Sequence, residues 1–309
     1  MNIIRMTGGM GNQMFQYALY LKLVSMGKEV KFDDITEYEL SNARPIMLWC
    51  FGIDYPKASR EEINEITDGF MMLSHRIRRK LFGRKSLEYH EADCNFDPQV
   101  LTQKNAYLTG YFQSELYFKD IEDRVREAFT FQPVIFEKLS EDRKEKIFSF
   151  LDQIDNTPSV SMHIRRGDYL TTSEVYGGNC TDAYYKRGIA LIREKYPEAK
   201  FFVFSNDDTW TRTWIKETFP GDNSFAVVEG VPEEEGYLDL YLMSRCKHCI
   251  LANSSFSWWG AWLNPSTRKL VIAPDRWFGN QDCADIYTEG MLRISPEGEI
   301  TKQGVKNDR

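Results

Sequence analysis

Residues 2–32 read NIIRMTGGMGNQMFQYALYLKLVSMGKEVKF, and this stretch predicts a strand, a turn, a helix and a second strand. The apolar residues 2–6 form the first strand, and the glycines between 8 and 11 form a tight turn. The helix, predicted over 12–26, carries apolar side chains on one face at Phe15, Leu19 and Leu23. The chain then returns through a strand at 29–32. Such an order is typical of an α/β unit built on a parallel sheet.

The second half of the chain repeats this alternation more regularly. Strands are predicted at 159–164, 200–205, 225–228, 248–251 and 269–273, and helices at 181–195, 208–218, 234–243 and 255–263. A turn-rich break, Asn156-Thr157-Pro158, precedes them. We therefore predict two Rossmann-like α/β domains with parallel sheets, one over 1–156 and one over 157–309. Ligands of such sheets bind outside the carboxyl ends of the strands, so we expect an active site in a cleft between the domains.

The first half is less regular between residues 36 and 97. Ser59 and Glu62 form the Ser-x-x-Glu pattern of a capping box, which predicts the start of a short helix. A basic amphipathic stretch follows at 71–85. Beyond it we expect a strand at 106–111 and two helices, at 118–129 and 136–154.

The composition describes an acidic protein with a sizeable core. Of the 309 residues, 39 are Lys or Arg and 46 are Asp or Glu, which gives a net charge of −7. An acidic balance argues against nucleic acid as a partner, because phosphate contacts need a basic surface. Apolar residues make up 42%, yet no stretch approaches the roughly 20 apolar residues of a membrane-spanning helix. Six cysteines are too few for a disulfide framework, so we expect a reducing, cytoplasmic setting.

The glycine turn at residues 8–11 is the first candidate site. A strand–turn–helix junction presents backbone N–H groups and the positive end of the helix to an anion or a polar ligand. A tight turn without a ligand is the plainer interpretation. A dinucleotide-binding motif would have a third glycine where Met14 stands, but Asp33 and Asp34 occupy the place of its ribose-binding acid. An NAD-type oxidoreductase is therefore an alternative on this segment.

The second candidate site is the end of the strand at 159–164. His163 and Arg165 share one face of this strand, and Arg166 and Asp168 follow directly. Arginine grips phosphate through two parallel hydrogen bonds, and an aspartate can orient it. A salt-bridged strand end is the structural alternative, but so many polar groups within six residues favour a site.

Two further polar segments follow predicted strands. Asn206, Asp207 and Asp208 place carboxylates where a nucleotide base could donate hydrogen bonds, although asparagine and aspartate are also preferred helix caps. Residues 253–265 place asparagine and serines at the start of a helix that Pro265 ends, which predicts a second anion cradle. The three tryptophans of this helix are predicted to belong to the core.

Other signals are weaker. Cys246 and Cys249 have the spacing of half a zinc site, but no matching pair follows, so we assign both to the core. The basic helix around Arg76 predicts a solvated face, with contact to a membrane surface as the alternative. The sequence has no Asp-x-Asp and no Walker loop, so the usual metal–nucleotide motifs of transferases and ATPases are missing.

Four segments resemble motifs of the α-1,2-fucosyltransferases of glycosyltransferase family 11. They are residues 8–18 (GGMGNQMFQYA), 110–115 (GYFQSE), 163–169 (HIRRGDY) and 253–261 (NSSFSWWGA). The segments occur in the order of the family and span nearly the whole chain. The resemblance implies a GT-B-type fold, in which 1–156 faces the acceptor and turns its glycines toward the donor, while 157–309 binds GDP-fucose.

The activity implied is an inverting, metal-independent transfer of L-fucose from GDP-fucose to the 2-hydroxyl of a terminal β-galactose, with no cofactor. The partners are then GDP-fucose and a galactose-terminated acceptor glycan, such as O-antigen or capsule. A lipid-linked acceptor would require at most a peripheral contact with the inner face of a membrane. Animal members carry an N-terminal membrane anchor, whereas this chain begins at a strand, so a bacterial, cytoplasmic enzyme is expected.

The resemblance also assigns site residues. Arg165 is expected to bind the β-phosphate of the donor and to be catalytic. The donor-binding set is Gly11, Asn12, His163, Arg165, Arg166, Asp207, Ser254, Ser255 and Phe256, with His163 and Asp207 near the guanosine. Asp168 is our candidate for the general base that inversion calls for, and Glu174 is the reserve. Besides the NAD-type oxidoreductase, a non-catalytic module that binds glycan or nucleotide is an alternative function.

Overall fold

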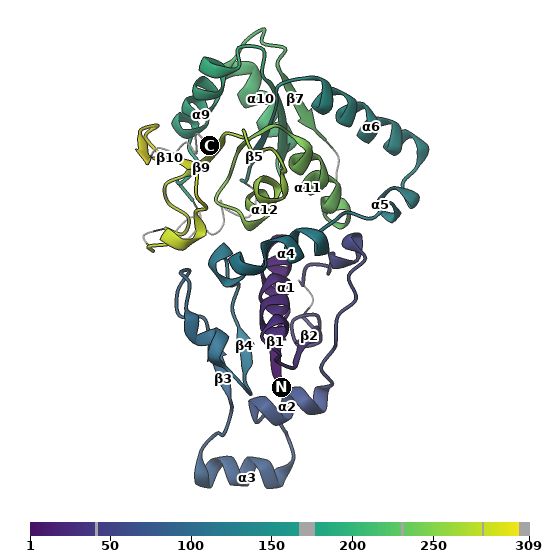
Figure 1. Cartoon of the computed structure of the whole chain (residues 1–309), viewed down its shortest axis with the longest axis vertical. Coiled ribbons are helices and arrows are strands. Elements are labelled where there is room, and N and C mark those ends of the chain that lie inside the picture. Colours follow the sequence, from purple (N-terminus) through teal and green to yellow (C-terminus); the bar gives the residue numbers. More distant parts are fainter. Residues whose placement is uncertain (41–42, 167–176, 230–231, 280, 303–309) are drawn as a thin grey trace. The chain divides into compact units, whose positions relative to one another are not determined.

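The computed structural model describes the chain except for residues 41–42, 167–176, 230–231, 280 and 303–309. It contains two compact units (Figure 1). Unit 1 comprises Met1–Thr130 and Ala284–Ile286, and unit 2 comprises Phe131–Cys283 and Tyr287–Arg309. No helix in the part of the chain that the structure describes is long and apolar enough to cross a membrane.

Unit 1 is built on a four-stranded parallel sheet in the order β2-β1-β4-β3. Its strands are β1 (Asn2–Arg5), β2 (Val30–Asp33), β3 (Glu88–His90) and β4 (Tyr107–Thr109). Its helices are α1 (Met10–Ser25), α2 (Arg60–Thr67), α3 (Leu73–Phe82) and α4 (Glu122–Ala128), with short 3-10 turns at Leu48–Phe51, Pro98–Thr102, Glu115–Tyr117, Lys119–Ile121 and Ala284–Ile286. The predicted apolar face of α1 is buried, as are Ile3 and Ile4 of β1, so helix and sheet share one core.

Unit 2 is built on a seven-stranded sheet in the order β11-β10-β9-β8-β5-β6-β7, parallel except for the pair β10–β11. Its strands are β5 (Ser159–Ile164), β6 (Lys200–Ser205), β7 (Phe225–Val228), β8 (His248–Ile250), β9 (Val271–Pro274), β10 (Met291–Ile294) and β11 (Ile300–Lys302). Its helices are α5 (Val134–Glu137), α6 (Glu141–Asn156), α9 (Asp182–Lys195), α10 (Asp208–Thr218), α11 (Gly236–Arg245) and α12 (Ser255–Leu263), with a 3-10 turn at Glu233–Glu235. All six residues of β5 are buried, as expected for a central strand covered on both faces.

The predicted α/β class and alternation are confirmed, with three differences. The helix expected at 136–154 is two helices, because Ser140 caps a new one by accepting a hydrogen bond from the Arg143 N–H at 3.4 Å. The sequence did not predict β3, β10 and β11, which are short and lack alternation. The compact units divide after Thr130, since α6 packs on unit 2 through the buried Ile147 and Ile154.

Candidate functional site

The glycine turn between β1 and α1 has the geometry that the sequence predicted. Gly8 has a φ of +74°, and a Cβ there would lie 2.5 Å from Asn12 Nδ2 and 3.2 Å from Tyr111 Cε1. A side chain at this position would therefore be strained and would displace Asn12. Asn12 Oδ1 accepts a hydrogen bond of 2.8 Å from Gln113 Nε2. Asn12 is thus fixed at the carboxyl end of β1, while Gly11 occupies the first turn of α1.

Two glutamines of α1, to which sequence reasoning assigned no role, hold this turn in place. Both are fully buried. Gln13 Nε2 donates to the Gly8 carbonyl at 2.9 Å and to the Pro45 carbonyl at 3.0 Å, and Gln13 Oε1 accepts from the Met47 N–H at 3.0 Å. Gln16 accepts from the Thr7 N–H at 3.1 Å and donates to the Gly110 carbonyl at 3.0 Å. Buried amides with all these partners make a rigid support for the turn.

A half-buried glutamate holds the neighbouring segment 110–113. Glu91 accepts hydrogen bonds from the Tyr111 N–H at 2.7 Å and from the Phe112 N–H at 2.9 Å. Phe112 has a left-handed φ of 54°, which is rare for a bulky residue and marks a constrained turn. Burial raises the pKa of Glu91 to about 7, although the two N–H groups act in the opposite direction. The constrained turn places Gln113 where it donates its hydrogen bond to Asn12.

Asp33, the acid that motivated the oxidoreductase alternative, has a structural role. Asp33 is fully buried, and its carboxylate accepts hydrogen bonds from the Ile35 and Thr36 N–H groups at 2.9 Å. It also accepts from the Tyr107 hydroxyl at 2.6 Å. These bonds lower the pKa of Asp33, against the effect of its burial. Asp33 is therefore a structural anchor and has no surface with which to bind a ribose.

In unit 2, the predicted site residues leave adjacent strands at one edge of the sheet. Strands β8, β5 and β6 are neighbours and run parallel, so the residues that follow them meet at their carboxyl ends. Arg165 and Arg166 follow β5, Asp207 follows β6, and Ser254 opens the helix after β8. The arrangement brings together the second, third and fourth candidate segments, as expected for a parallel sheet.

Arg166 is held in place by residues that follow β6 and by a residue of α10. Its N–H donates to Asn206 Oδ1 at 2.9 Å, and its guanidinium carbon lies 3.9 Å from the centre of the Trp210 ring. Its Nε is 3.9 Å from Asp207 Oδ2, and both side chains are about one-third exposed, at 31% and 34%. A stacked and ion-paired guanidinium keeps its orientation, which suits recognition of a phosphate or a base. Arg165, which is half-buried, stands beside it at the strand end.

Asp207 has the helix-capping role that the sequence gave as an alternative. Its Oδ1 accepts from the Trp210 N–H at 3.1 Å and caps α10, while its own N–H donates to Ser205 Oγ at 3.0 Å. Asp207 Oδ2 points toward Arg166. Of the three polar residues here, Asn206 holds the arginine backbone and Asp207 orients the arginine side chain.

The start of α12 contributes the third part of the site. Ser254 caps this helix, with its Oγ accepting from the Phe256 N–H at 3.3 Å. The buried His163 ring lies 6.0 Å from the Phe256 ring, centre to centre, and links β5 to α12. Ser255 is the first residue of the helix and is half-buried. Asn253 anchors the loop by donating to the Trp277 carbonyl at 3.0 Å.

Two predicted residues lie outside the described residues, namely Asp168 and Glu174, our candidates for the general base. Two further predictions, both about core residues, are confirmed. Trp258, Trp259 and Trp262 are core residues, and so are Cys246 and Cys249, whose thiol pKa values are raised by burial.

Sequence reasoning missed a half-buried acid of unit 2, Asp239 in the first turn of α11. Its Oδ1 is buried and has no hydrogen-bond partner. Burial raises the pKa of Asp239 to about 8, a rise that Asp208 reinforces and that Arg143 opposes. Arg143 itself pairs with Glu235 at 3.2 Å. The signal in the sequence was a lone acid in a helix that buries residues on all sides, among them Tyr237, Leu238 and Leu240.

The sequence matches a known family over most of its length. Residues 1–291 match the family described as glycosyl transferase family 11. An alpha-1,2-colitosyltransferase of Escherichia coli is 32% identical over 286 residues, which are 91% of this chain and 93% of the relative. The O-antigen biosynthesis glycosyltransferase WbnK of Escherichia coli is 30% identical over 310 residues, 94% of this chain and 99% of the relative.

A more distant relative and a solved structure complete the comparison. The galactoside alpha-(1,2)-fucosyltransferase 1 of Sus scrofa is 27% identical over 263 residues, covering 83% of this chain and 63% of that protein. The crystal structure of POFUT1 in complex with GDP-fucose aligns with a TM-score of 0.46 at 11% identity, covering 89% of this chain and 97% of the other.

The chain belongs to glycosyl transferase family 11, and its activity is the transfer of a glycosyl group. The predicted α/β class with two GT-B-like parallel-sheet units is confirmed. The oxidoreductase alternative is wrong, because the family is one of transferases and because Asp33 is used by the fold.

Proposed function

We propose that the protein is an inverting, metal-independent galactoside α-1,2-fucosyltransferase that uses GDP-fucose. The observation that carries the proposal is the meeting of two arginines, the carboxylate of Asp207 and the serine-capped start of α12 at adjacent strand ends. Arginines and helix N-terminal N–H groups suit a diphosphate, and a carboxylate suits the N–H donors of guanine. The names of the fucosyltransferase relatives support the sugar and the linkage.

The proposed reaction is a single displacement at C1 of fucose. The bond between C1 and the β-phosphate oxygen breaks, and its electron pair leaves with GDP. The 2-hydroxyl oxygen of galactose forms the new bond from the opposite face, which inverts the configuration at C1. The hydroxyl proton passes to a carboxylate base, for which Asp168 is our candidate and Glu174 the reserve, and then to water.

In this proposal Arg165 meets the charge that develops on the leaving GDP. Loss of one such preorganised donor costs on the order of 3 kcal/mol, a few hundredfold in rate. We expect Arg165→Ala to lose a few hundredfold in kcat/KM, whereas Arg187→Ala, the same change in α9 of the same unit, keeps the rate of the natural enzyme. Near-normal turnover by Arg165→Ala would remove Arg165 from the role of phosphate clamp.

The E. coli colitosyltransferase relative motivates a second candidate donor, GDP-colitose. Colitose is fucose without the 3-hydroxyl, so the two donors share the leaving group and differ in one polar contact. A site that hydrogen-bonds a substrate hydroxyl strongly rejects a substrate that lacks this hydroxyl. A site without that hydrogen bond rejects a substrate that carries the hydroxyl far less strongly. The ratio of kcat/KM for the two donors therefore identifies the natural sugar.

The experiment is an assay of the purified chain with each donor and with lactose as acceptor, in EDTA. We expect release of GDP and formation of a 2′-fucosylated product from GDP-fucose. Transfer from GDP-colitose alone would replace the donor in the proposal, and dependence on added Mn²⁺ would overturn the metal-free mechanism. GDP binding without turnover on any β-galactoside would favour the non-catalytic module. We propose a cytoplasmic location, where nucleotide sugars are the donors.

A further inference from the structure

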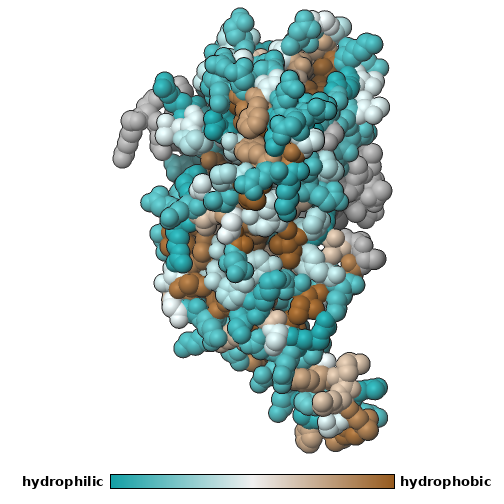
Figure 2. Space-filling view, turned by 90° about the vertical axis from the view of Figure 1, so that its right-hand side faces the viewer, coloured by the Kyte–Doolittle hydropathy of each residue, from teal (hydrophilic) through white to brown (hydrophobic). Residues whose placement is uncertain are grey.

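The helix α3 of unit 1 exposes an unusual number of large apolar side chains. None of its residues is buried. The exposed fractions are 70% at Leu73, 50% at Ile77, 69% at Leu81 and 74% at Phe82, and just before the helix they are 77% at Met71 and 67% at Met72. Figure 2 shows these apolar residues gathered over one end of unit 1. Contiguous apolar surface of this kind marks a site of interaction with a membrane or a partner.

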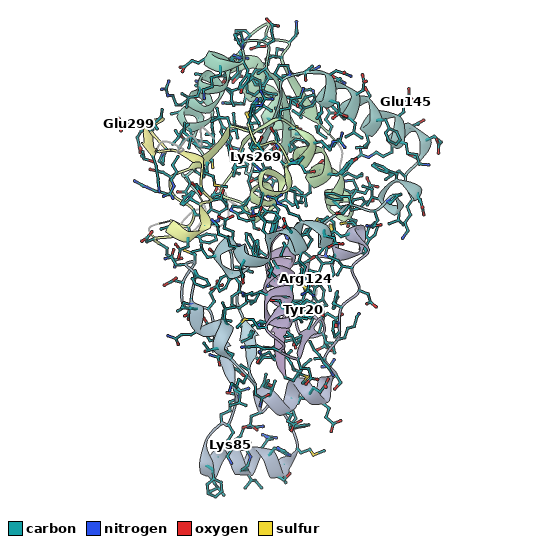
Figure 3. All side chains as sticks on the ribbon, viewed as in Figure 1. Tyr20, Lys85, Arg124, Glu145, Lys269 and Glu299 are labelled. Carbon is teal, nitrogen blue, oxygen red and sulfur yellow. The ribbon has the colours of Figure 1, made fainter. Side chains whose placement is uncertain are left out.

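The apolar side chains of α3 form a stripe with cations beside it. Leu73, Ile77 and Leu81 follow one another at intervals of four residues and therefore share one face of the helix. Arg76 and Lys80 are also four residues apart and flank that face. Both are exposed, as are Arg84 and Lys85 just beyond the helix; Figure 3 labels Lys85 at this end of the unit. The sequence from 69 to 87 contains no acidic residue.

A polar clamp holds this segment, so its apolar face is not needed for folding. Asp68, itself buried, pairs with Arg78 and accepts a hydrogen bond of 3.0 Å from the Lys85 N–H. Arg79 donates to the carbonyls of Asp68 at 2.7 Å and Phe70 at 2.8 Å. The clamp joins the two ends of the segment 68–85, and its hydrogen bonds lower the pKa of Asp68 to about 2. Arg78 and Arg79 therefore serve the fold, while Arg76 and Lys80 lie on the surface.

We propose that α3 is a membrane-docking helix that binds an anionic lipid bilayer, with its apolar stripe in the interface and its cations on the headgroups. Interfacial helices combine a large apolar face with Lys and Arg, and each cation near an anionic surface contributes about 1 kcal/mol. The rest of the chain is acidic, since the net charge is −7 although this segment is basic. An anionic surface therefore attracts this end and repels the remainder, which orients the protein.

Charge complementarity favours a bilayer over a second copy of the chain. A symmetric pair formed through α3 would place Arg76 and Lys80 of one copy against the same cations of the other. A bilayer with anionic headgroups presents the opposite charge and has no fixed shape to match.

The docking helix is separate from the candidate site within unit 1. α3 immediately precedes β3, which runs parallel to β1 and β4, so it lies toward the amino ends of these strands. The glycine turn and the segment 110–113 lie at the carboxyl ends. Membrane binding is therefore independent of the sugar donor and can be altered without touching the proposed transfer chemistry.

The experiment is co-sedimentation of the full chain with vesicles of phosphatidylcholine, with and without phosphatidylglycerol. We expect binding to the anionic vesicles and little to the neutral ones, reduced by salt. Arg76→Gln with Lys80→Gln should weaken partitioning about 30-fold, since two cations contribute about 2 kcal/mol. The control, Lys216→Gln with Arg268→Gln, removes the same charge from exposed positions of unit 2 and should keep full binding.

A second variant tests the apolar stripe. Leu73→Ser, Ile77→Ser and Leu81→Ser together should reduce binding to that seen with neutral vesicles, while transfer to lactose, a soluble acceptor, stays unchanged and shows that the fold is intact. Equal binding by this variant and the natural protein would overturn the proposal. The proposal would also be overturned if the natural protein did not bind vesicles, whether or not it self-associates in sedimentation equilibrium. Self-association that the serine variant abolishes would assign the stripe to contact with a second copy of the chain.

Discussion

The half-buried carboxylate of Glu91 predicts a specific dependence of stability on pH. Burial raises its pKa from 4.5 to about 7. A raised pKa means that the folded state favours the protonated form, so the stability is fully present below pH 4.5 and is lost as the pH rises through about 7. A shift of this size corresponds to roughly 3 kcal/mol of unfolding free energy, at 1.36 kcal/mol for each pH unit.

The perturbation is Glu91→Gln, which removes the titrating group and keeps an oxygen that can accept one of the two N–H groups of Tyr111 and Phe112. Leaving the other N–H without a partner costs about 1–3 kcal/mol at every pH. We therefore expect the difference in unfolding free energy between the natural protein and Glu91→Gln to change by roughly 3 kcal/mol between pH 4.5 and 8, in favour of the variant at high pH.

Urea unfolding at a series of pH values measures this difference, and hydrogen exchange of the Tyr111 and Phe112 amides reports it locally. Glu88 lies in β3, the strand that leads to Glu91. The control variant Glu88→Gln removes an equal charge and therefore corrects for the change in net charge. Parallel stability curves for the natural protein and Glu91→Gln would refute the reasoning, because they would show that Glu91 does not titrate differently in the folded state.

Three further predictions test other parts of the account. Gly8→Ala should cost about 1–2 kcal/mol of stability because Gly8 has a left-handed φ, and it should also lower activity by displacing Asn12. Gly27 has a similar φ of +75° but open space around it, so Gly27→Ala should lower stability and leave activity unchanged. The natural protein should lose stability as the pH rises from about 4 through about 8, because the folded state favours protonated Asp239. In urea unfolding, Asp239→Asn should not show this loss. The same pH profile for both proteins would contradict the raised pKa of Asp239. Trp210→Leu should weaken GDP binding about two- to fivefold in calorimetry by removing the stack on Arg166, and unchanged affinity would place the nucleotide elsewhere.

Much of the fold was predictable because the signals were local. The alternation of apolar runs and amphipathic helices from 159 to 273 depends only on neighbours in sequence, and β5 and β6 have the predicted bounds. β3 was not predictable, since Glu88-Tyr89-His90 has no apolar pattern and becomes a strand only by pairing with β4. Its existence depends on a partner almost twenty residues away.

The candidate site shows the same division. Its strand-end residues could be read from the sequence because parallel strands bring their carboxyl ends together. Gln16 and Glu91 could not, because their partners, the Gly110 carbonyl and the Tyr111 and Phe112 N–H groups, are distant in sequence and belong to the backbone. Asp207 combined two roles that the sequence offered as alternatives, since one oxygen caps α10 and the other faces Arg166.

The central claim is that the carboxyl edge of the sheet in unit 2 holds the donor nucleotide. A crystal structure of the chain with GDP tests it most directly. We expect electron density for the diphosphate beside Arg165 and the start of α12, with the guanine near His163 and Asp207. A diphosphate bound instead at the glycine turn of α1, away from both arginines, would contradict it.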